Sequence, residues 1–244
     1  MPEATTATVT RGRPLVVAID GPSGSGKSST ARGVARRLGL AFLDTGAMYR
    51  AATWLAVQRG VDLSQTAAVA ELVRESEMDL VLEPDGFTIA IDGTDVTTAI
   101  RAPEVSAVVS AVATNLDVRA DLVARQREII AEAAGGIVAE GRDITTVVAP
   151  DADVRVLLVA DPEARIARRH AELSDRADVA AVTDQVIRRD RDDSTVAQFT
   201  SAAPGVHVID STELSLDDVV SAICALVPAT SSTTTRCCPA TLFS

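Results

Sequence analysis

Aromatic residues, histidine and cysteine are scarce in this chain, and each scarcity excludes something. Only 2% of the 244 residues are aromatic while 47% are hydrophobic, so the core must be built from Ala, Val, Leu and Ile. Two histidines and three cysteines (Cys224, Cys237 and Cys238) offer neither a disulfide framework nor a set of zinc ligands. We therefore expect a protein of the reducing cytoplasm.

Long apolar runs and an excess of positive charge are also missing. No run reaches the roughly 18 apolar residues that a membrane-spanning helix needs, and residues 1–13 contain no apolar signal region. The net charge of −11 disfavours general binding to nucleic acid or to an anionic membrane. We expect neither partner, and because no large apolar surface stripe is evident we expect a monomer.

The clearest motif is a glycine-rich loop, G-x-x-x-x-G-K-S, which runs from Gly21 to Ser28. A strand-like segment, Leu15–Ile19, precedes it and an amphipathic segment, Ser29–Leu38, follows it, which is the strand–loop–helix context that the motif requires. Successive backbone N–H groups of such a loop, together with the start of the helix, cradle phosphate oxygens. The predicted ATP-binding residues are Gly21, Pro22, Ser23, Gly24, Ser25, Gly26, Lys27, Ser28 and Ser29.

Two of these side chains have specific chemistry in a phosphate loop. Lys27 is expected to reach the β- and γ-phosphates, and the Ser28 hydroxyl is expected to bind Mg²⁺. Asp20 and Asp143 are further candidates for contacts to Mg²⁺ or water. The motif predicts binding of a nucleoside triphosphate but does not identify what receives the phosphoryl group.

Apolar segments elsewhere in the chain predict a parallel sheet. The five segments are Leu15–Ile19, Leu40–Leu43, Ile137–Ala139, Val154–Val159 and Val206–Ile209. Helical patterns separate most of them, so we expect an α/β fold with five parallel strands and helices on both faces, a P-loop NTPase core. Residues 60–105 break the alternation, because they predict a helix over Ala67–Glu77 and a hairpin around Glu83–Gly86.

The expected organisation is one domain over residues 14–227. Its core comprises residues 14–59, 106–161 and 194–227, with an α+β insert over about 60–105 and a charged helical segment over about 162–193. The lead 1–13 and the Ser/Thr-rich tail 228–244 lack hydrophobic periodicity, so we expect both to be disordered.

Arginines stand beside acids or hydroxyls after several predicted strands, where open parallel sheets bind their ligands. The clusters are Asp44/Thr45/Arg50, Arg142/Asp143 and Arg189/Asp193. Arginine forks match phosphate, whereas carboxylates and hydroxyls can read a base or a ribose. A second nucleotide-shaped site is therefore expected to face the phosphate loop, although Asp44 and Thr45 also suit the capping of a helix.

These segments resemble the bacterial cytidylate kinases, a branch of the nucleoside monophosphate kinases. The resemblance covers about residues 14–227 and rests on AIDGPSGSGKSS (18–29), FLDTGAMYRA (42–51), VAEGRDITTVVAPDADVRVLL (138–158), PEARIARR (162–169), RRDRDDST (188–195) and VIDSTELSLDDVV (208–220). It implies transfer of the γ-phosphoryl group of ATP to CMP or dCMP, giving CDP or dCDP, with Mg²⁺. The insert would bind the monophosphate, and the charged segment would be a small lid.

The resemblance also implies roles for individual residues, by motif position. The cytosine would contact Thr45, Asp143 and Arg119. The acceptor phosphate would contact Arg50 and Arg142, and the ribose would contact Ser110, Arg189 and Asp193. The lid would close Arg165 and Arg169, with Arg168 beside them, over the donor phosphates. Catalysis would come from positioning and charge neutralisation, without a general base, through Lys27, Arg142, Arg165 and Arg169.

The chain departs from the family pattern on the acceptor side. Val196 stands where an arginine is common, and the loss of one charge-assisted contact is worth about 1.5–3 kcal/mol. Thr145-Thr146 replaces a Gly-Thr pair, and Ala149 replaces an aromatic residue. Two alternative hypotheses remain open: a catalytically weak paralogue that binds or senses CMP, and a P-loop kinase of a non-nucleotide small molecule.

Overall fold

The computed structural model describes residues 13–172 and 179–228. The predicted disordered lead and tail, and with them Cys237 and Cys238, lie outside the described residues apart from Arg13 and Pro228. Among the described helices, none is long and apolar enough to cross a membrane.

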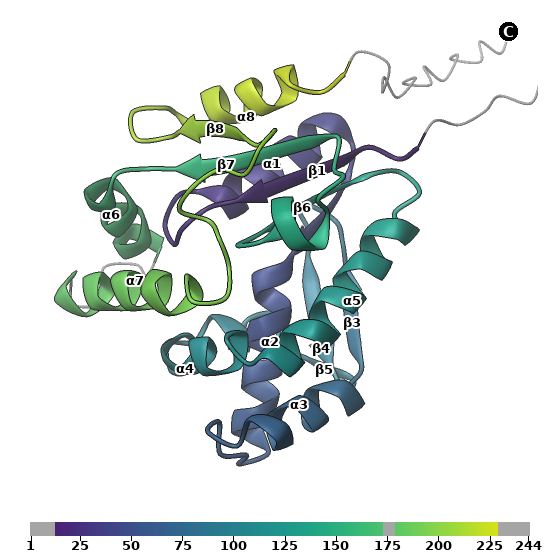
Figure 1. The fold of residues 1–244 in the computed structure, drawn as a ribbon, viewed down its shortest axis with the longest axis vertical. Helices are drawn as coiled ribbons and strands as arrows, with labels where there is room; N and C mark the ends of the chain where they lie inside the picture. The colour runs from purple at the N-terminus through teal and green to yellow at the C-terminus, as the bar shows by residue number, and fades with distance from the viewer. Residues whose placement is uncertain (1–12, 173–178, 229–244) are drawn as a thin grey trace, which may run out of the picture.

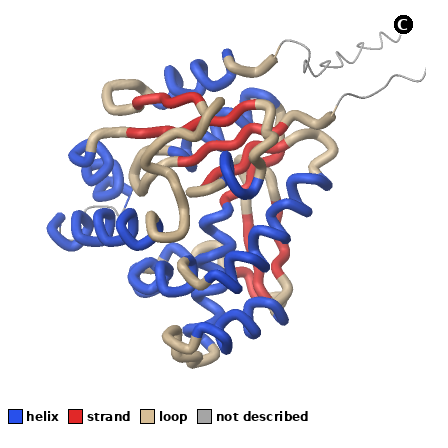
Figure 2. The backbone as a smooth tube through the Cα atoms, viewed as in Figure 1, coloured by secondary structure: helices blue, strands red, loops and turns tan. Residues whose placement is uncertain are grey.

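A five-stranded sheet forms the centre of the molecule (Figures 1 and 2). Its strands are β1 (Val16–Asp20), β2 (Ala41–Asp44), β6 (Ile137–Gly141), β7 (Val154–Val159) and β8 (His207–Asp210). They lie in the order β2-β6-β1-β7-β8, and every pairing is parallel. The prediction of five parallel strands is confirmed, and no strand end differs from the predicted one by more than two residues.

Helices cover both faces of this sheet, which is why β1 and β6 are buried along their whole length. On one face α1 (Lys27–Leu38) packs against α8 (Leu216–Ala225), and on the other lie the π-helical turn η2 (Ile144–Val148) and α5 (Leu116–Glu132) (Figure 1). The core is aliphatic as predicted, with Phe42 and Phe199 the only aromatic rings among its largest fully buried side chains in the described chain.

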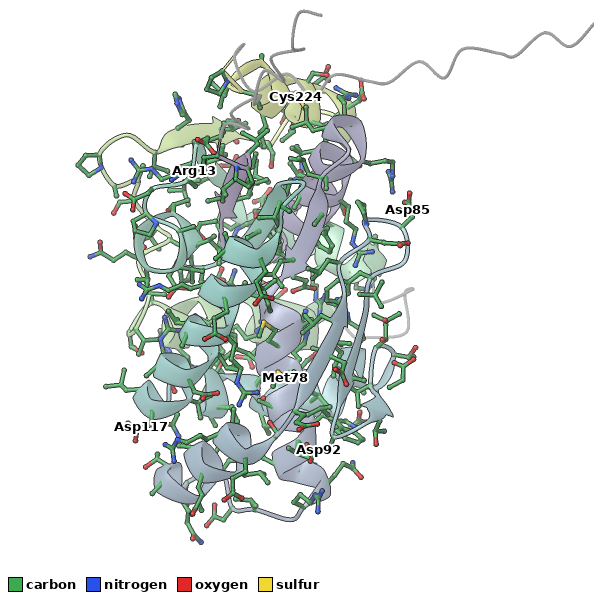
Figure 3. The ribbon with its side chains drawn as sticks, turned by 90° about the vertical axis from the view of Figure 1, so that its right-hand side faces the viewer. Arg13, Met78, Asp85, Asp92, Asp117 and Cys224 are labelled. Atoms are coloured by element: carbon green, nitrogen blue, oxygen red, sulfur yellow. The ribbon has the colours of Figure 1, made fainter. Side chains whose placement is uncertain are left out.

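The insert forms a second, smaller sheet beside α2 (Thr45–Gln58). After α3 (Thr66–Glu75) come β3 (Met78–Val81), β4 (Thr88–Ile91) and β5 (Thr94–Asp95), which pair antiparallel, and then the short 3-10 helix η1 (Ala99–Arg101). The predicted hairpin is confirmed. Its tip, which carries the Asp85 labelled in Figure 3, reaches α1 through an ion pair with Arg36.

The hairpin is also joined to the core sheet. The amide of Phe42 in β2 donates to the carbonyl of Leu82 at 2.7 Å, and the rings of Phe42 and Phe87 meet edge to face at 5.5 Å. The insert therefore rests on the same strand that leads into α2 and the candidate site.

Three further helices complete the described fold: α4 (Pro103–Ala113) lies between the insert and α5, and α6 (Pro162–Glu172) and α7 (Val179–Asp193) follow β7. Asn115 caps α5 by accepting from the amides of Asp117 and Val118, which explains the break that the sequence predicts between α4 and α5. In Figure 1, α6 and α7 lie together beyond the ends of β1 and β7, over the phosphate loop.

Candidate active site

The phosphate loop leaves the carboxyl end of the central strand β1 and runs into α1. Gly24 and Gly26 have φ of 76° and 86°, the left-handed region that side-chain-bearing residues avoid. A Cβ at Gly24 would also lie 2.4 Å from the carbonyl oxygen of Arg165. Because α1 begins at Lys27, its unpaired amides and positive dipole end face the ligand position.

A cavity of about 480 Å³ opens in front of this loop. Its wall combines the loop with the start of α2, the inner face of α4, the end of β6 and part of α6 and α7. The predicted site residues on this wall are Ser23, Gly24, Gly26, Lys27, Ser28, Ser29, Thr45, Arg50, Arg119, Arg142, Asp143, Arg169, Arg189 and Asp193. Residues expected for the donor and for the acceptor therefore share one cavity.

Other predicted site residues lie off this wall, namely Gly21, Pro22, Ser25, Ser110 and Arg165. On α4 the cavity is lined by Ser106, one turn before Ser110. Arg165 instead donates to the carbonyl of Ser23 at 3.0 Å and forms an ion pair with Asp190. In the described arrangement Arg165 supports the loop from behind rather than facing the cavity.

Lys27 carries a charge that its surroundings disfavour. Burial, with a smaller contribution from the neighbouring Arg142, lowers its pKa to about 8 against the opposing charge of Glu140. Its Nζ donates to the carbonyl of Pro22 at 3.4 Å. A phosphate in the cavity would supply the counter-charge, so the site is electrostatically prepared for an anion.

Arg189 contributes to the same positive field. Burial lowers its pKa to about 9, and the nearby Arg142 and Arg50 act in the same direction. Its Nε is buried without a hydrogen-bond partner. Arginines that crowd one another in this way gain most from a bound polyanion.

Ser28 and Glu140 bring a hydroxyl and a carboxylate together beside the loop. The Ser28 Oγ donates to Glu140 Oε1 at 2.6 Å, and Glu140, at the end of β6, is only 2% exposed. Burial raises the pKa of Glu140, and the charge of Asp44 adds to the rise. A hydroxyl and a carboxylate next to bound phosphates suit Mg²⁺, which takes one or two protein ligands together with phosphate oxygens.

Glu140 was not singled out as a site residue from the sequence. The signal that could have identified it is an acidic residue near the end of an apolar strand. In the structure this strand pairs directly with β1, and Glu140 is in register with Ile19. Asp20, a candidate for contacts to Mg²⁺ or water, has a different role, because its two carboxylate oxygens accept hydrogen bonds from Ile144 and Thr145. These contacts attach Asp20 to the following segment, and a contact with Mg²⁺ or water stays a prediction for Asp20 and for Asp143.

Asp44 organises the arginines on the acceptor side. It caps α2 by accepting from the Ala47 amide at 2.8 Å, and its carboxylate pairs with Arg50 at 3.1 Å and Arg101 at 2.7 Å. Burial by itself would raise the pKa of Asp44, but the two guanidinium groups outweigh it and hold the pKa below its usual value. Arg101, which lines the cavity from η1, was missed because only the fold of the insert brings it to Asp44.

Arg119, Asp143 and Thr45 line the same cavity. Arg119 forms an ion pair with Asp143, and Thr45 Oγ1 donates to the Glu140 carbonyl at 2.7 Å. Burial raises the pKa of Asp143 against the opposing charge of Arg119. A carboxylate, a guanidinium and a hydroxyl are thus grouped where a planar polar base would fit.

Arg142 links the end of β6 to α7. Its Nε pairs with Asp193 at 3.1 Å, another of its nitrogens lies 3.3 Å from Asp190, and it donates to the Gly21 carbonyl at 2.6 Å. Asp190 in turn accepts from the Ser23 amide at 2.9 Å. Asp190 was overlooked in the sequence because a charged helix usually faces solvent, and only the packing of α7 on the loop reveals it.

A second, smaller hollow of about 220 Å³ lies on the other side of the loop. Arg168 borders it and donates to the Ser211 carbonyl at 2.6 Å. Leu214, Leu216 and Val219 give the hollow an apolar wall next to Gly26 and Ser29. It is continuous with the phosphate loop and suits the flat apolar faces of a base.

The fold and the site together define an enzyme of the P-loop kinase class, since a phosphate loop on a central parallel strand faces converging arginines across one cavity. The family model described as cytidylate kinase matches residues 17–229. This chain belongs to the cytidylate kinase family.

Individual relatives agree with this membership. The chain is 57% identical over 220 residues to the cytidylate kinase of Cutibacterium acnes, covering 89% of this chain and 97% of that protein. It is 45% identical over 215 residues to the cytidylate kinase of Streptomyces avermitilis, covering 87% and 92%. A solved structure of an uncharacterized protein from Eubacterium ventriosum has a TM-score of 0.50 at 10% identity, covering 87% of this chain and 98% of that chain, and shows the fold alone.

Proposed function

We propose that this protein transfers the γ-phosphoryl group of ATP to CMP or dCMP, giving ADP and CDP or dCDP, in pyrimidine nucleotide metabolism. The observation that carries the proposal is the single cavity that joins the phosphate loop to the Asp143–Arg119 pair. Membership of the cytidylate kinase family supports the same reaction.

The donor side would hold ATP through the loop amides and Lys27. The triphosphate lies across the start of α1, and its negative charge relieves the penalty that lowers the pKa of Lys27 to about 8. The adenine occupies the smaller hollow between Arg168 and Leu216. Ser28 and Glu140 would hold Mg²⁺, which supplies charge neutralisation between phosphate oxygens when bound.

The acceptor side would read cytosine by its hydrogen-bonding edge. The Asp143 carboxylate accepts from the exocyclic amino group, and Arg119 donates to a ring or carbonyl acceptor. Uracil presents a carbonyl oxygen where cytosine presents that amino group, so it would face the carboxylate unfavourably. Thr45 adds a hydroxyl at the same end of the cavity.

The acceptor phosphate would lie between Arg50 and Arg142, with Arg101 beside them. Asp44 already orients Arg50 and Arg101, so these forks need little reorganisation when the phosphate arrives. Arg189 and Asp193 would meet the ribose, and Arg169 would approach the transferred group from α6. Ser110 remains a proposed ribose contact that requires α4 to shift on binding.

Catalysis then consists of alignment and charge neutralisation. The attacking oxygen of the monophosphate and the γ-phosphorus of ATP face each other among Lys27, Arg142 and Arg169, whose charges stabilise the transferred group in transit. Arg165 holds the loop in shape through Ser23. Closure of α6 and α7, a lid over about residues 162–193, would exclude water that otherwise hydrolyses ATP.

We further propose that residues 14–227 act as one monomeric unit in the cytoplasm, with residues 60–105 as the monophosphate-binding insert.

A coupled assay of ADP release with Mg-ATP tests the function, using CMP, dCMP, UMP and AMP as acceptors. CMP or dCMP should stimulate ADP release well above UMP and AMP. If neither cytidine nucleotide stimulates it, the proposed function is wrong.

The assignment of the cytosine site has its own test. Asp143→Asn should reduce kcat/KM for CMP by about tenfold or more, because asparagine has one acceptor oxygen in place of the two that would accept from Arg119 and from the amino group of cytosine. Asp79→Asn, at an exposed position of β3, is the matched control and should match the unmodified protein. Equal kinetics for both variants would remove Asp143 from the site.

A further inference from the structure

Asp20 connects the phosphate loop to the acceptor side of the cavity. It is the last residue of β1, directly before Gly21, and is 1% exposed. Its Oδ1 accepts from the Ile144 amide at 2.8 Å, and its Oδ2 accepts from the Thr145 amide at 2.8 Å and the Thr145 Oγ1 at 2.6 Å. Three donors from one short segment therefore converge on one carboxylate.

Asp20 is attached to the chain on both sides of Arg142 and Asp143, two residues proposed to contact the acceptor. Asp20 pairs with Gly141 in the parallel register of β1 and β6, and it also holds Ile144 and Thr145. Arg142 and Asp143 are the only residues between these two attachments. The conformation of this stretch is irregular, with Asp143 at φ −146° and ψ 25°, so it depends on the contacts that hold it.

The Thr145 hydroxyl is a distinct part of this arrangement. Two of the three donors are backbone amides that any residue at 145 would supply, but the third exists only because the side chain is threonine. Burial raises the pKa of Asp20 to about 6, and the hydrogen bonds from Thr145 and Ile144 oppose the rise. Without the hydroxyl, Asp20 would remain buried with one hydrogen bond fewer.

We propose that Asp20 and Thr145 are positioning residues for acceptor selection, which hold Asp143 and Arg142 at a defined place opposite the phosphate loop. This inference rests on the proposed function and adds residues that do not touch the substrate. A loosened segment would move the carboxylate that reads cytosine and the arginine that holds the acceptor phosphate. Its effect on the loop amides and Lys27 would be smaller, because in the described chain the segment reaches the loop only through the hydrogen bond of Arg142 to the Gly21 carbonyl and its ion pair with Asp190, so ATP binding should change less than CMP binding.

The decisive experiment compares Thr145→Val with Thr145→Ser. Valine keeps the shape and the amide but removes the donor, whereas serine keeps the hydroxyl. Thr145→Val should raise the KM for CMP about five- to tenfold and lower the CMP-to-UMP ratio of kcat/KM by a similar factor, with the KM for ATP within about twofold. Thr145→Ser should stay within about twofold of the unmodified protein in the KM for CMP, the KM for ATP and the CMP-to-UMP ratio of kcat/KM.

Thr146→Val provides the matched control, since it makes the same chemical change one residue further along. It should leave the CMP-to-UMP ratio of kcat/KM, the KM for CMP and the KM for ATP unchanged. Asp20→Asn should raise the KM for CMP at least as much as Thr145→Val does. If Asp20→Asn does not fold, the comparison of Thr145→Val with Thr145→Ser still tests the inference. The inference is overturned if Thr145→Val and Thr145→Ser behave alike, or if the KM for ATP rises as much as the KM for CMP.

Calorimetric titration of CMP separates this inference from the proposed function. An unmodified protein that binds and phosphorylates CMP, with a Thr145→Val variant of equal affinity and selectivity, would refute only the positioning role. An unmodified protein that neither binds nor phosphorylates CMP would refute the proposed function and the inference with it. Weaker CMP binding by Thr145→Val than by Thr145→Ser, with both variants folded at the assay temperature, would support the positioning role.

Discussion

Replacing Lys27 by methionine should make the ligand-free protein more stable while abolishing its response to ATP. In the folded state burial and Arg142 lower the pKa of Lys27 from 10.5 to about 8. At about 1.4 kcal/mol for each tenfold change, this lowering costs about 3 kcal/mol of folding free energy at neutral pH. Because the open cavity admits water to Lys27, solvent screening reduces this cost in folding free energy to about 1–2 kcal/mol.

The pH dependence of this cost has a definite sign. Below about pH 8 Lys27 is charged in both states and the full penalty is present. Between about pH 8 and 10.5 the folded protein releases the proton that the unfolded chain still binds, so stability rises relative to the methionine variant. The advantage of Lys27→Met should therefore be greatest near pH 7 and shrink toward pH 10.

Urea unfolding at pH 7 and at pH 9.5, with and without Mg-ATP, measures both effects. The unmodified protein should gain stability from ATP by mass action, and Lys27→Met should not. Arg74→Met, on the exposed face of α3, is the control for loss of a positive charge and should change stability by less than about 0.5 kcal/mol. A ligand-free Lys27→Met protein less stable than the unmodified one at pH 7 would refute the electrostatic reasoning.

Three further predictions concern the acceptor side and the metal. Val196→Arg, on the cavity wall, should lower the KM for CMP by up to about tenfold, and an unchanged KM would mean that other arginines already serve that phosphate. Glu140→Gln should lower kcat at least tenfold and raise the Mg²⁺ concentration for half-maximal rate; an unaltered Mg²⁺ response would remove Glu140 from the metal site. Asp44→Asn should cost about 3 kcal/mol or more in urea unfolding, since it leaves Arg50 without its buried partner, and a loss under about 1 kcal/mol would contradict this.

Much of the architecture follows from local sequence pattern. The spacing of Gly21, Gly26 and Lys27 specifies a phosphate loop, because only glycine takes the left-handed angles and close approaches found there. The apolar segments around the loop specify parallel strands, because strands buried on both faces are uniformly hydrophobic. The hairpin around Glu83–Gly86 was equally readable from its turn residues.

The resemblance to a known family extended this to predicted roles for individual side chains. Thr45, Asp143 and Arg119 all line the cavity, and Arg119 pairs with Asp143. Arg165 and Ser110 lie off its wall in the described arrangement, and the substrate contacts of all five stay predictions. A motif records which residue types occur and in what order, but the direction of each side chain depends on how its helix packs.

Several polar contacts at the site depend on the tertiary structure alone. Asp44 joins Arg50 to Arg101 from the insert, Ser28 meets Glu140 from a neighbouring strand, and Asp20 receives Thr145. The contacts of Asp44 with Arg101, Ser28 with Glu140 and Asp20 with Thr145 each join segments far apart in the chain, so no local periodicity encodes them. They arise because parallel strands bring their carboxyl ends to one edge of the sheet, where burial strengthens every interaction between the charges that gather there.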